Sequence, residues 1–295
     1  MASPIRTVVA ASDFSFSAHR AARRAGMLAR SHGAALRLLH VIDSSSAKAL
    51  LRNRPNLELE QPLRLEAERA LASLAADVAA AGGTVADRLL REGKVMDEIL
   101  AAAARSDLLV LGPRGINPIK DFFLGSTAER MARMIERPML VVKQDPQVVY
   151  DNVLVPVDFS DYSAPALRFA AELAPSATLH VLHALDCPLE GRLRSAGVTE
   201  EGVSAYCDEL HREAKASMDE LTASVQGRTV FGTVQAGDAR ALITALAAAN
   251  HYSLIVLGKQ GRSWLSEHIL GSVTHLVLER AACDVAVVPH HGQLS

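Results

Sequence analysis

Residues 108–127 read LLVLGPRGINPIKDFFLGST, and residues 254–273 read LIVLGKQGRSWLSEHILGSV. Each copy has a short apolar run, a glycine, two residues, a second glycine, nine residues, and a third glycine followed by serine. The apolar runs are rich in leucine, valine and isoleucine, which is typical of a strand buried on both faces. The glycines at the three fixed positions are Gly112, Gly115 and Gly125 in the first copy and Gly258, Gly261 and Gly271 in the second.

Each copy is predicted to fold as a strand, a glycine loop and a helix N-terminus. Glycine lets a ligand approach the main chain closely, and Ser126 and Ser272 are predicted to cap the helix that follows. The N–H groups and the dipole at a helix N-terminus favour an anion such as phosphate. Alternatively, the glycines only shape a tight connection, because a single glycine motif is weak evidence for binding. The second copy at the same spacing favours the binding loop.

The other predicted elements also occur twice in the same order. In the first half, strands are predicted at 5–11, 35–42, 84–90, 108–111 and 139–142, and helices at 17–31, 62–81, 95–105 and after Gly125. In the second half, strands are predicted at 153–157, 178–183, 229–235, 254–257 and 285–288, and helices at 165–173, 200–225, 239–250 and after Gly271. The segment 44–61 shows no clear period and is predicted to be a loop with a short helical piece. The segment 186–199 is predicted to be irregular.

Strands that alternate with helices predict parallel sheets with right-handed crossovers. The chain is therefore expected to be an α/β protein with two tandem doubly wound (Rossmann-like) domains, residues 1–146 and 147–295. Ligands of such sheets lie beyond the carboxyl ends of the strands. Asp13 and Asp158 follow the first strand of each half, and the glycine loops follow the fourth, so one cleft is predicted per half. The alternative role for each aspartate is to cap the next helix.

Composition excludes several classes of function. Among the 295 residues, 49% are apolar and 22% charged, as in soluble globular domains. The net charge of −2 argues against binding nucleic acid or an anionic membrane, and no stretch of about 20 apolar residues could span a bilayer. No signal peptide is evident. The cysteines, Cys187, Cys207 and Cys283, lack metal-ligand spacing, so a cytoplasmic protein with unpaired thiols and no metal site is expected.

The repeated glycine signature, the acid after the first strand and the His-Val ending of the second strand resemble the universal stress protein family in its tandem form. The resemblance covers nearly the whole chain. It implies an open five-stranded sheet of order 3-2-1-4-5 in each half, flanked by helices. It also points to the branch of the family that binds ATP, together with Mg²⁺. In that branch the acid and the end of strand two hold adenosine, and the glycine loop and next helix turn hold phosphate.

Carried over by position, the resemblance assigns a set of binding residues to each half. In the first half these are Asp13 and Val41 for adenosine, and Gly112, Arg114, Gly115, Gly125, Ser126 and Thr127 for phosphate. In the second half they are Pro156, Asp158 and Ala184, and then Gly258, Lys259, Gly261, Gly271, Ser272, Val273 and Thr274.

The two predicted clefts are not equivalent. Pro113 removes a backbone donor from the first glycine loop, and Arg114 beside it supplies charge instead. Lys259 and Gln260 keep both N–H groups in the second loop and add a cation. The second cleft is therefore predicted to bind nucleotide at least as well as the first.

No catalytic set accompanies the glycine loops in the sequence. The P-loop and the Gly-x-Ser-x-Gly elbow are absent, and Asp121 and Glu267 are poorly placed to hold catalytic metals. The sequence thus predicts a non-catalytic, nucleotide-dependent stress or signalling module. Two alternatives stay open: a protein-interaction module whose glycine loops are only structural, and a slow ATPase.

Assembly is predicted from the fifth strand of each half, because an open sheet leaves its outer strand as an unpaired edge. Residues 139–142 are expected to pair with residues 285–288 within the chain, as the family resemblance also implies. A homodimer and an unidentified protein partner complete these expectations. His40 and His183, which end apolar strands, are predicted to be structural.

Overall fold

The computed structural model describes residues 5–43, 60–115, 124–147, 149–225, 227–249, 252–261 and 269–290. The chain divides into two compact units. The first unit holds the residues up to Val149 together with Asp284–Pro289, and the second begins at Tyr150 and continues to Cys283. The segment 44–59, most of the segment predicted to be a loop with a short helical piece, lies outside the described residues, as do Asp121 and Glu267.

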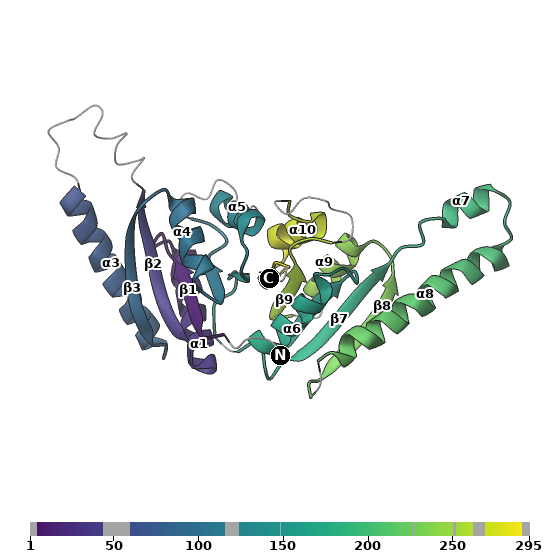
Figure 1. The fold of residues 1–295 in the computed structure, drawn as a ribbon, viewed down its shortest axis with the longest axis horizontal. Helices are drawn as coiled ribbons and strands as arrows, with labels where there is room; N and C mark the ends of the chain where they lie inside the picture. Colours follow the sequence, from purple (N-terminus) through teal and green to yellow (C-terminus); the bar gives the residue numbers. More distant parts are fainter. Residues whose placement is uncertain are drawn as a thin grey trace, which may run out of the picture. The chain divides into compact units, whose positions relative to one another are not determined.

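The first unit is built on a sheet of strand order β3-β2-β1-β4-β5-β10, of which Figure 1 labels β3, β2 and β1. Its strands are β1 (Thr7–Ala11), β2 (Ala35–Asp43), β3 (Val85–Gly93), β4 (Leu108–Leu111), β5 (Met139–Val141) and β10 (Asp284–Val288). The five strands of the first repeat are mutually parallel and follow the predicted order 3-2-1-4-5. β10 pairs antiparallel with β5, with Val285 opposite Val141, as predicted for the two fifth strands.

Among the described residues, four helices flank this sheet: α1 (Phe16–His32), α3 (Glu60–Ala80), α4 (Val95–Ala104) and α5 (Ser126–Met134). α1 packs against α3, and α4 packs against α5. Right-handed crossovers to a sheet of this order place these two helix pairs on opposite faces. α3 buries Ala67, Leu71, Leu74 and Val78, which are spaced to form a single helix face.

The second unit contains four parallel strands in the order β8-β7-β6-β9. These are β6 (Asn152–Val157), β7 (Thr178–Leu185), β8 (Val230–Ala236) and β9 (Leu254–Gly258). Its helices are α6 (Ser163–Leu173), α7 (Glu190–Ser195), α8 (Glu200–Ala223), α9 (Ala239–Ala249) and α10 (Ser272–Arg280). By sequence β10 is the fifth strand of the second repeat, although its residues are counted in the first unit.

The segment 186–199, predicted to be irregular, contains the six-residue helix α7. This prediction was wrong for a physical reason. α7 buries none of its residues, so it has no apolar face from which a helical period could be read.

Burial explains why the glycine loops begin where they do. All four residues of β4 are buried, as are Leu254–Leu257 of β9. Both strands carry apolar side chains on both faces. Gly112 and Gly258 follow at the carboxyl ends of these runs. Among the described residues, no helix is long and apolar enough to cross a membrane.

Candidate functional site

Each unit has a cavity at the carboxyl ends of its strands. The cavity of the first unit measures about 610 Å³ and that of the second about 550 Å³, both within the range of small-molecule sites. All eight residues predicted for the first cleft line the first cavity: Asp13, Val41, Gly112, Arg114, Gly115, Gly125, Ser126 and Thr127. The second cavity is lined by all but one of the residues predicted for the second cleft: Pro156, Asp158, Ala184, Gly258, Gly261, Gly271, Ser272, Val273 and Thr274.

The acid and the glycine loop meet directly in both cavities. A Cβ atom added to Gly115 would lie 2.6 Å from Oδ2 of Asp13, and one added to Gly261 would overlap Oδ2 of Asp158. Only a glycine therefore lets the loop backbone approach the carboxylate this closely. The end of the first strand and the end of the fourth form one site in each repeat, as the sheet order requires.

The aspartates are not helix caps. Ser15 caps α1, since its side chain accepts a hydrogen bond from the Ala18 N–H group. Oδ1 of Asp13 accepts from the Ser15 N–H group at 3.0 Å, and Oδ1 of Asp158 accepts from the Ser160 N–H group at the same distance. These bonds close a turn at the strand end and fix each carboxylate. The capping interpretation of Asp13 and Asp158 was wrong.

A strained phenylalanine follows each aspartate. Phe14 has φ 63° and Phe159 has φ 57°, a left-handed conformation that is uncommon for residues with a bulky side chain. The Phe14 ring stacks on His40 at 4.3 Å between centroids, and the Phe159 ring lies 4.4 Å from His183. Such strain persists where surrounding contacts impose it, often at binding sites.

The two histidines connect neighbouring strand ends. Nδ1 of His40 lies 2.8 Å from the Ser12 carbonyl oxygen, and Nδ1 of His183 lies 2.9 Å from that of Val157. With Nδ1 as the donor, each ring ties the end of its own strand to the end of the neighbouring one. Both rings line their cavities, so these structural contacts also shape the walls.

The third glycine of each motif closes the loop. The Gly125 N–H group donates to the Pro113 carbonyl at 2.7 Å, and the Gly271 N–H group donates to that of Lys259 at 2.9 Å. A Cβ on Gly125 would lie 3.1 Å from the Pro113 oxygen. The two ends of each nine-residue spacer are therefore joined backbone to backbone, which explains the fixed spacing.

Gly125 and Gly271, rather than the serines, are the N-cap residues of α5 and α10. Neither cap makes a side-chain hydrogen bond, and Ser126 and Ser272 are the first helical residues. The predicted capping role of the serines was therefore wrong. The first N–H groups of a helix have no partner within the helix. In α5 and α10 these N–H groups have no side-chain cap as a partner, so they can donate hydrogen bonds to an anion.

The positively charged side chains in or near the two clefts come from different elements. Arg114 lines the first cavity from the glycine loop. Lys259 is only 6% exposed and is absent from the described lining of the second cavity, unlike its prediction as a phosphate ligand. Arg240 is also absent from that lining, but its Nη2 donates to Oγ of the lining residue Ser272, at the start of α10, at 3.2 Å. Sequence reasoning missed Arg240, which stands on α9 far from the glycine motif.

The glycine loop of the second repeat is held by side-chain hydrogen bonds that differ from the one described in the first. The Tyr162 hydroxyl donates to Oε1 of Gln260 at 2.7 Å, and Nε2 of Gln260 donates to the Ile269 carbonyl at 2.5 Å. In the first repeat, Ser17 fills the place of Tyr162, and its hydroxyl donates to the Arg114 carbonyl at 2.5 Å. Both devices fix the glycine loop against the first helix of the repeat.

Thr274 also has a structural contact. Its hydroxyl donates to the Gly258 carbonyl at 2.8 Å, and the residue is 4% exposed. This bond ties the first turn of α10 to the end of β9. Thr274 therefore supports the loop, in addition to lining the cavity.

The fold and the two clefts define a tandem doubly wound α/β protein with a cavity at the carboxyl edge of each unit. The chain belongs to the universal stress protein family, whose sequence pattern matches residues 4–143 and 149–289.

Individual relatives agree with this assignment. Universal stress protein YxiE of Bacillus subtilis is 31% identical over 158 residues, covering 48% of this chain and 99% of that protein. A universal stress protein of Mycolicibacterium smegmatis is 28% identical over 207 residues, covering 68% of this chain and 67% of that protein. The crystal structure of a universal stress protein from Archaeoglobus fulgidus superposes with a TM-score of 0.69 over 96% of this chain and 98% of that one. At 20% identity, this likeness concerns the fold.

Proposed function

We propose that this universal stress protein binds an adenine nucleotide in each repeat and acts as a non-catalytic stress-response or signalling module. One observation carries the proposal. In each repeat a fixed carboxylate, a glycine loop and a helix N-terminus without a side-chain cap line the same cavity.

The lining suits the two ends of ATP. A carboxylate accepts hydrogen bonds, so Asp13 and Asp158 suit donor groups of adenosine beside Val41 and Ala184. Phosphate suits the N-termini of α5 and α10, where backbone N–H groups and the helix dipole attract anions. Arg114 in the first cleft and Arg240 near the second supply a guanidinium on the phosphate side.

Mg²⁺ would accompany the nucleotide rather than occupy a protein site of its own. Asp13 is the only carboxylate in the described lining of the first cavity, and its Oδ1 already accepts a backbone hydrogen bond. Phosphate oxygens and water commonly supply most ligands of nucleotide-bound Mg²⁺. In the first cavity, one carboxylate is also too few for the two-metal clamp of in-line phosphoryl displacement, which supports binding rather than turnover there. The described lining of the second cavity holds three carboxylates, Asp158, Asp186 and Glu213.

Calorimetric titration with ATP, ADP, AMP and adenosine, with and without Mg²⁺, tests the proposal. We expect two sites per chain, one lost in Asp13→Ala, the other in Asp158→Ala and both in the double variant. Arg133→Gln on the outer face of α5 is the matched control. Absence of binding to the wild-type protein would favour glycine loops that are only structural. Steady phosphate release that disappears in Gly271→Val would favour a slow ATPase.

We place this binding activity in the cytoplasm, and we include a homodimer and a protein partner in the proposal. Cys187 and Cys207 are thiols rather than a disulfide, which suits a reducing compartment. Cell fractionation tests the location. Light scattering with and without ATP tests whether nucleotide controls self-association.

A further inference from the structure

Two cysteines far apart in the sequence meet in the second unit. Cys187 follows β7, and Cys207 lies in the second turn of α8. Glu190, the first residue of α7, joins them. The two Sγ atoms and a carboxylate oxygen of Glu190 all lie within 4.8 Å of one another, and all three residues are partly buried.

We propose that Cys187, Glu190 and Cys207 bind a thiophilic divalent cation of the Zn²⁺ type. Zn²⁺ bonds thiolate sulfur at about 2.3 Å and carboxylate oxygen at about 2.0 to 2.2 Å in a tetrahedron. Ligand atoms on one such ion lie about 3.5 to 3.8 Å apart, given these bond lengths. The three ligand atoms of the cluster, all within 4.8 Å of one another, lie near that spacing. Two thiolates also select against Mg²⁺ and Ca²⁺, which prefer oxygen ligands.

The surroundings leave the cluster able to bind. Glu190 lies 2.9 Å from the Arg194 guanidinium, but a carboxylate has two oxygens and can serve a cation and an arginine together. His211 stands one turn after Cys207 on α8 and is exposed. Residues four apart share a helix face, so His211 or a water molecule can complete the tetrahedron.

The two thiols must lose their protons for a cation to bind as proposed. The pKa of Cys187 is raised to about 11 by its hydrogen bond with Cys207, together with burial and the negative charges of Glu190 and Asp186. Without a cation, Cys187 therefore stays protonated at neutral pH. Binding of the ion displaces protons from both thiols to solvent, and no electron transfer is involved.

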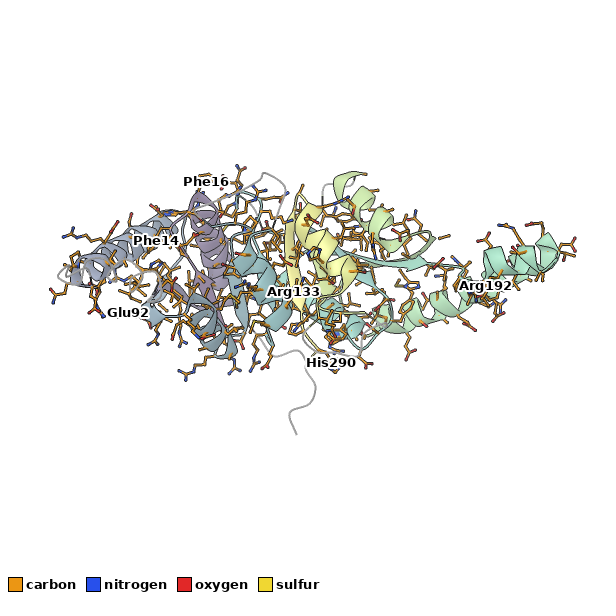
Figure 2. All side chains as sticks on the ribbon, turned by 90° about the horizontal axis from the view of Figure 1, so that it is seen from above. Phe14, Phe16, Glu92, Arg133, Arg192 and His290 are labelled. Carbon is orange, nitrogen blue, oxygen red and sulfur yellow. The ribbon has the colours of Figure 1, made fainter. Side chains whose placement is uncertain are left out.

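The site lies beside the second cavity. Asp186 and Pro188, the neighbours of Cys187, line that cavity, as do Leu210 and Glu213 of α8. A bound cation would hold the segment leading into α7, which carries the labelled Arg192 in Figure 2, against α8. The first repeat contains no cysteine, so the device belongs to the second repeat alone.

Cobalt titration tests the inference without nucleotide. The full chain is purified anaerobically with reductant, stripped with chelator and titrated with Co²⁺. We expect one ion per chain, an intense thiolate-to-cobalt charge-transfer band, and displacement of Co²⁺ by Zn²⁺. Cys187→Ser and Cys207→Ser should each weaken Zn²⁺ binding by more than about 100-fold, because each removes a direct ligand. Cys283→Ala, the matched control, should leave the band unchanged.

Thiol alkylation gives a readout that does not depend on variants folding. Zn²⁺ should protect the peptides that carry Cys187 and Cys207 from alkylation of the native wild-type protein. The inference is overturned by absence of the charge-transfer band, by a band that survives in both serine variants, or by a disulfide between the two residues in the reduced preparation. None of these outcomes bears on whether ATP binds, since no nucleotide is present.

Discussion

Nε of Arg24 lies 3.3 Å from Oδ2 of Asp284, and the two side chains are only 4% and 0% exposed. Arg24 belongs to α1, and Asp284 is the first residue of β10. Oδ1 of Asp284 accepts hydrogen bonds from the Lys143 and Gln144 N–H groups at 2.7 and 2.9 Å. One buried carboxylate therefore joins β10 to the helix and to the chain just after β5.

Asp284→Ala should strongly destabilise the first unit. Removing one partner of a buried ion pair leaves an uncompensated charge and costs about 3 to 5 kcal/mol of unfolding free energy. Urea unfolding measures the change. Asp145→Ala is the matched control, because Asp145 pairs with the adjacent Arg23 at 3.0 Å on the exposed surface, and such pairs contribute at most about 1 kcal/mol. Equal losses in the two variants would contradict the role assigned to burial.

Alanine at two glycines of the same motif should separate folding from binding. At Gly115 the added Cβ meets only the Asp13 side chain, with Oδ2 at 2.6 Å, and a side-chain end can rotate away. Gly115→Ala should therefore fold normally and bind ATP about 10 to 100-fold more weakly in the first cleft, from loss of one charged hydrogen bond.

Gly112→Ala is the counterpart. Its Cβ would meet the backbone carbonyl carbon of Ser17 at 2.9 Å, which cannot rotate away. Overpacking of this kind costs about 1 to 3 kcal/mol. Circular dichroism with thermal unfolding, followed by calorimetry with ATP, distinguishes the two variants. Full ATP affinity in Gly115→Ala would mean that the position of the Asp13 carboxylate is irrelevant to binding.

The two arginines should act on phosphate and not on adenosine. Arg114→Gln should weaken ATP binding in the first cleft about tenfold, and Arg240→Gln should do so in the second, since each removes a charge-assisted contact. Adenosine affinity should not change. Calorimetry in an Asp158→Ala or Asp13→Ala background isolates each cleft. An equal loss for ATP and adenosine would place the arginine elsewhere in the site.

Acid should weaken the first unit through Asp107. Burial tends to raise the pKa of Asp107, but hydrogen bonds from the Arg6 N–H group and from the Thr7 hydroxyl and N–H groups lower it below 3.8. A carboxyl group with a lowered pKa contributes stability above its unfolded pKa and loses it as the pH falls through the folded value.

Asp107→Asn should therefore cost about 1 kcal/mol at pH 7, as expected for lost hydrogen bonds to a charged group that is partly exposed. The difference from the wild type should shrink as the pH falls from about 3.8 through the lowered pKa of native Asp107, because first the unfolded state and then the native carboxylate becomes protonated. Urea unfolding across pH 2.5 to 7 measures it. In the second repeat, the Asn152 N–H group donates a hydrogen bond to the Ser253 hydroxyl rather than to a carboxylate. The stability change caused by Ser253→Ala should therefore show no such pH dependence. A constant gap between Asp107→Asn and wild type would contradict the mechanism.

Periodicity and the repeat predicted most of the architecture, because buried strands and amphipathic helices carry their burial in the order of residues. The motif also predicted which residues line each cavity, since strand ends in a parallel sheet converge at one edge. Local hydrogen bonds at the strand ends were harder to predict from the sequence. The sequence pointed to Asp13 as the alternative cap of α1, whereas Ser15 accepts the capping hydrogen bond and Asp13 accepts from the Ser15 N–H group.

Contacts that depend on the packing of separate elements could not be predicted. Arg240 reaches Ser272 from another helix, and nothing in the glycine motif points to it. Cys187 and Cys207 are brought together by a turn through α7, a helix without an apolar face. Their sequence separation matches no known ligand spacing.

The assignment of β10 to the first unit bears on the order of events during synthesis. β5 keeps an open edge until residues 284–289 have been made, because β10 is its antiparallel neighbour. At about 5 to 20 residues per second, translation of the intervening repeat takes roughly 10 to 30 s. During that interval the nascent N-terminal unit presents a bare strand to other nascent chains in a polysome. The ribosome must therefore complete β10 before the first unit is protected from aggregation.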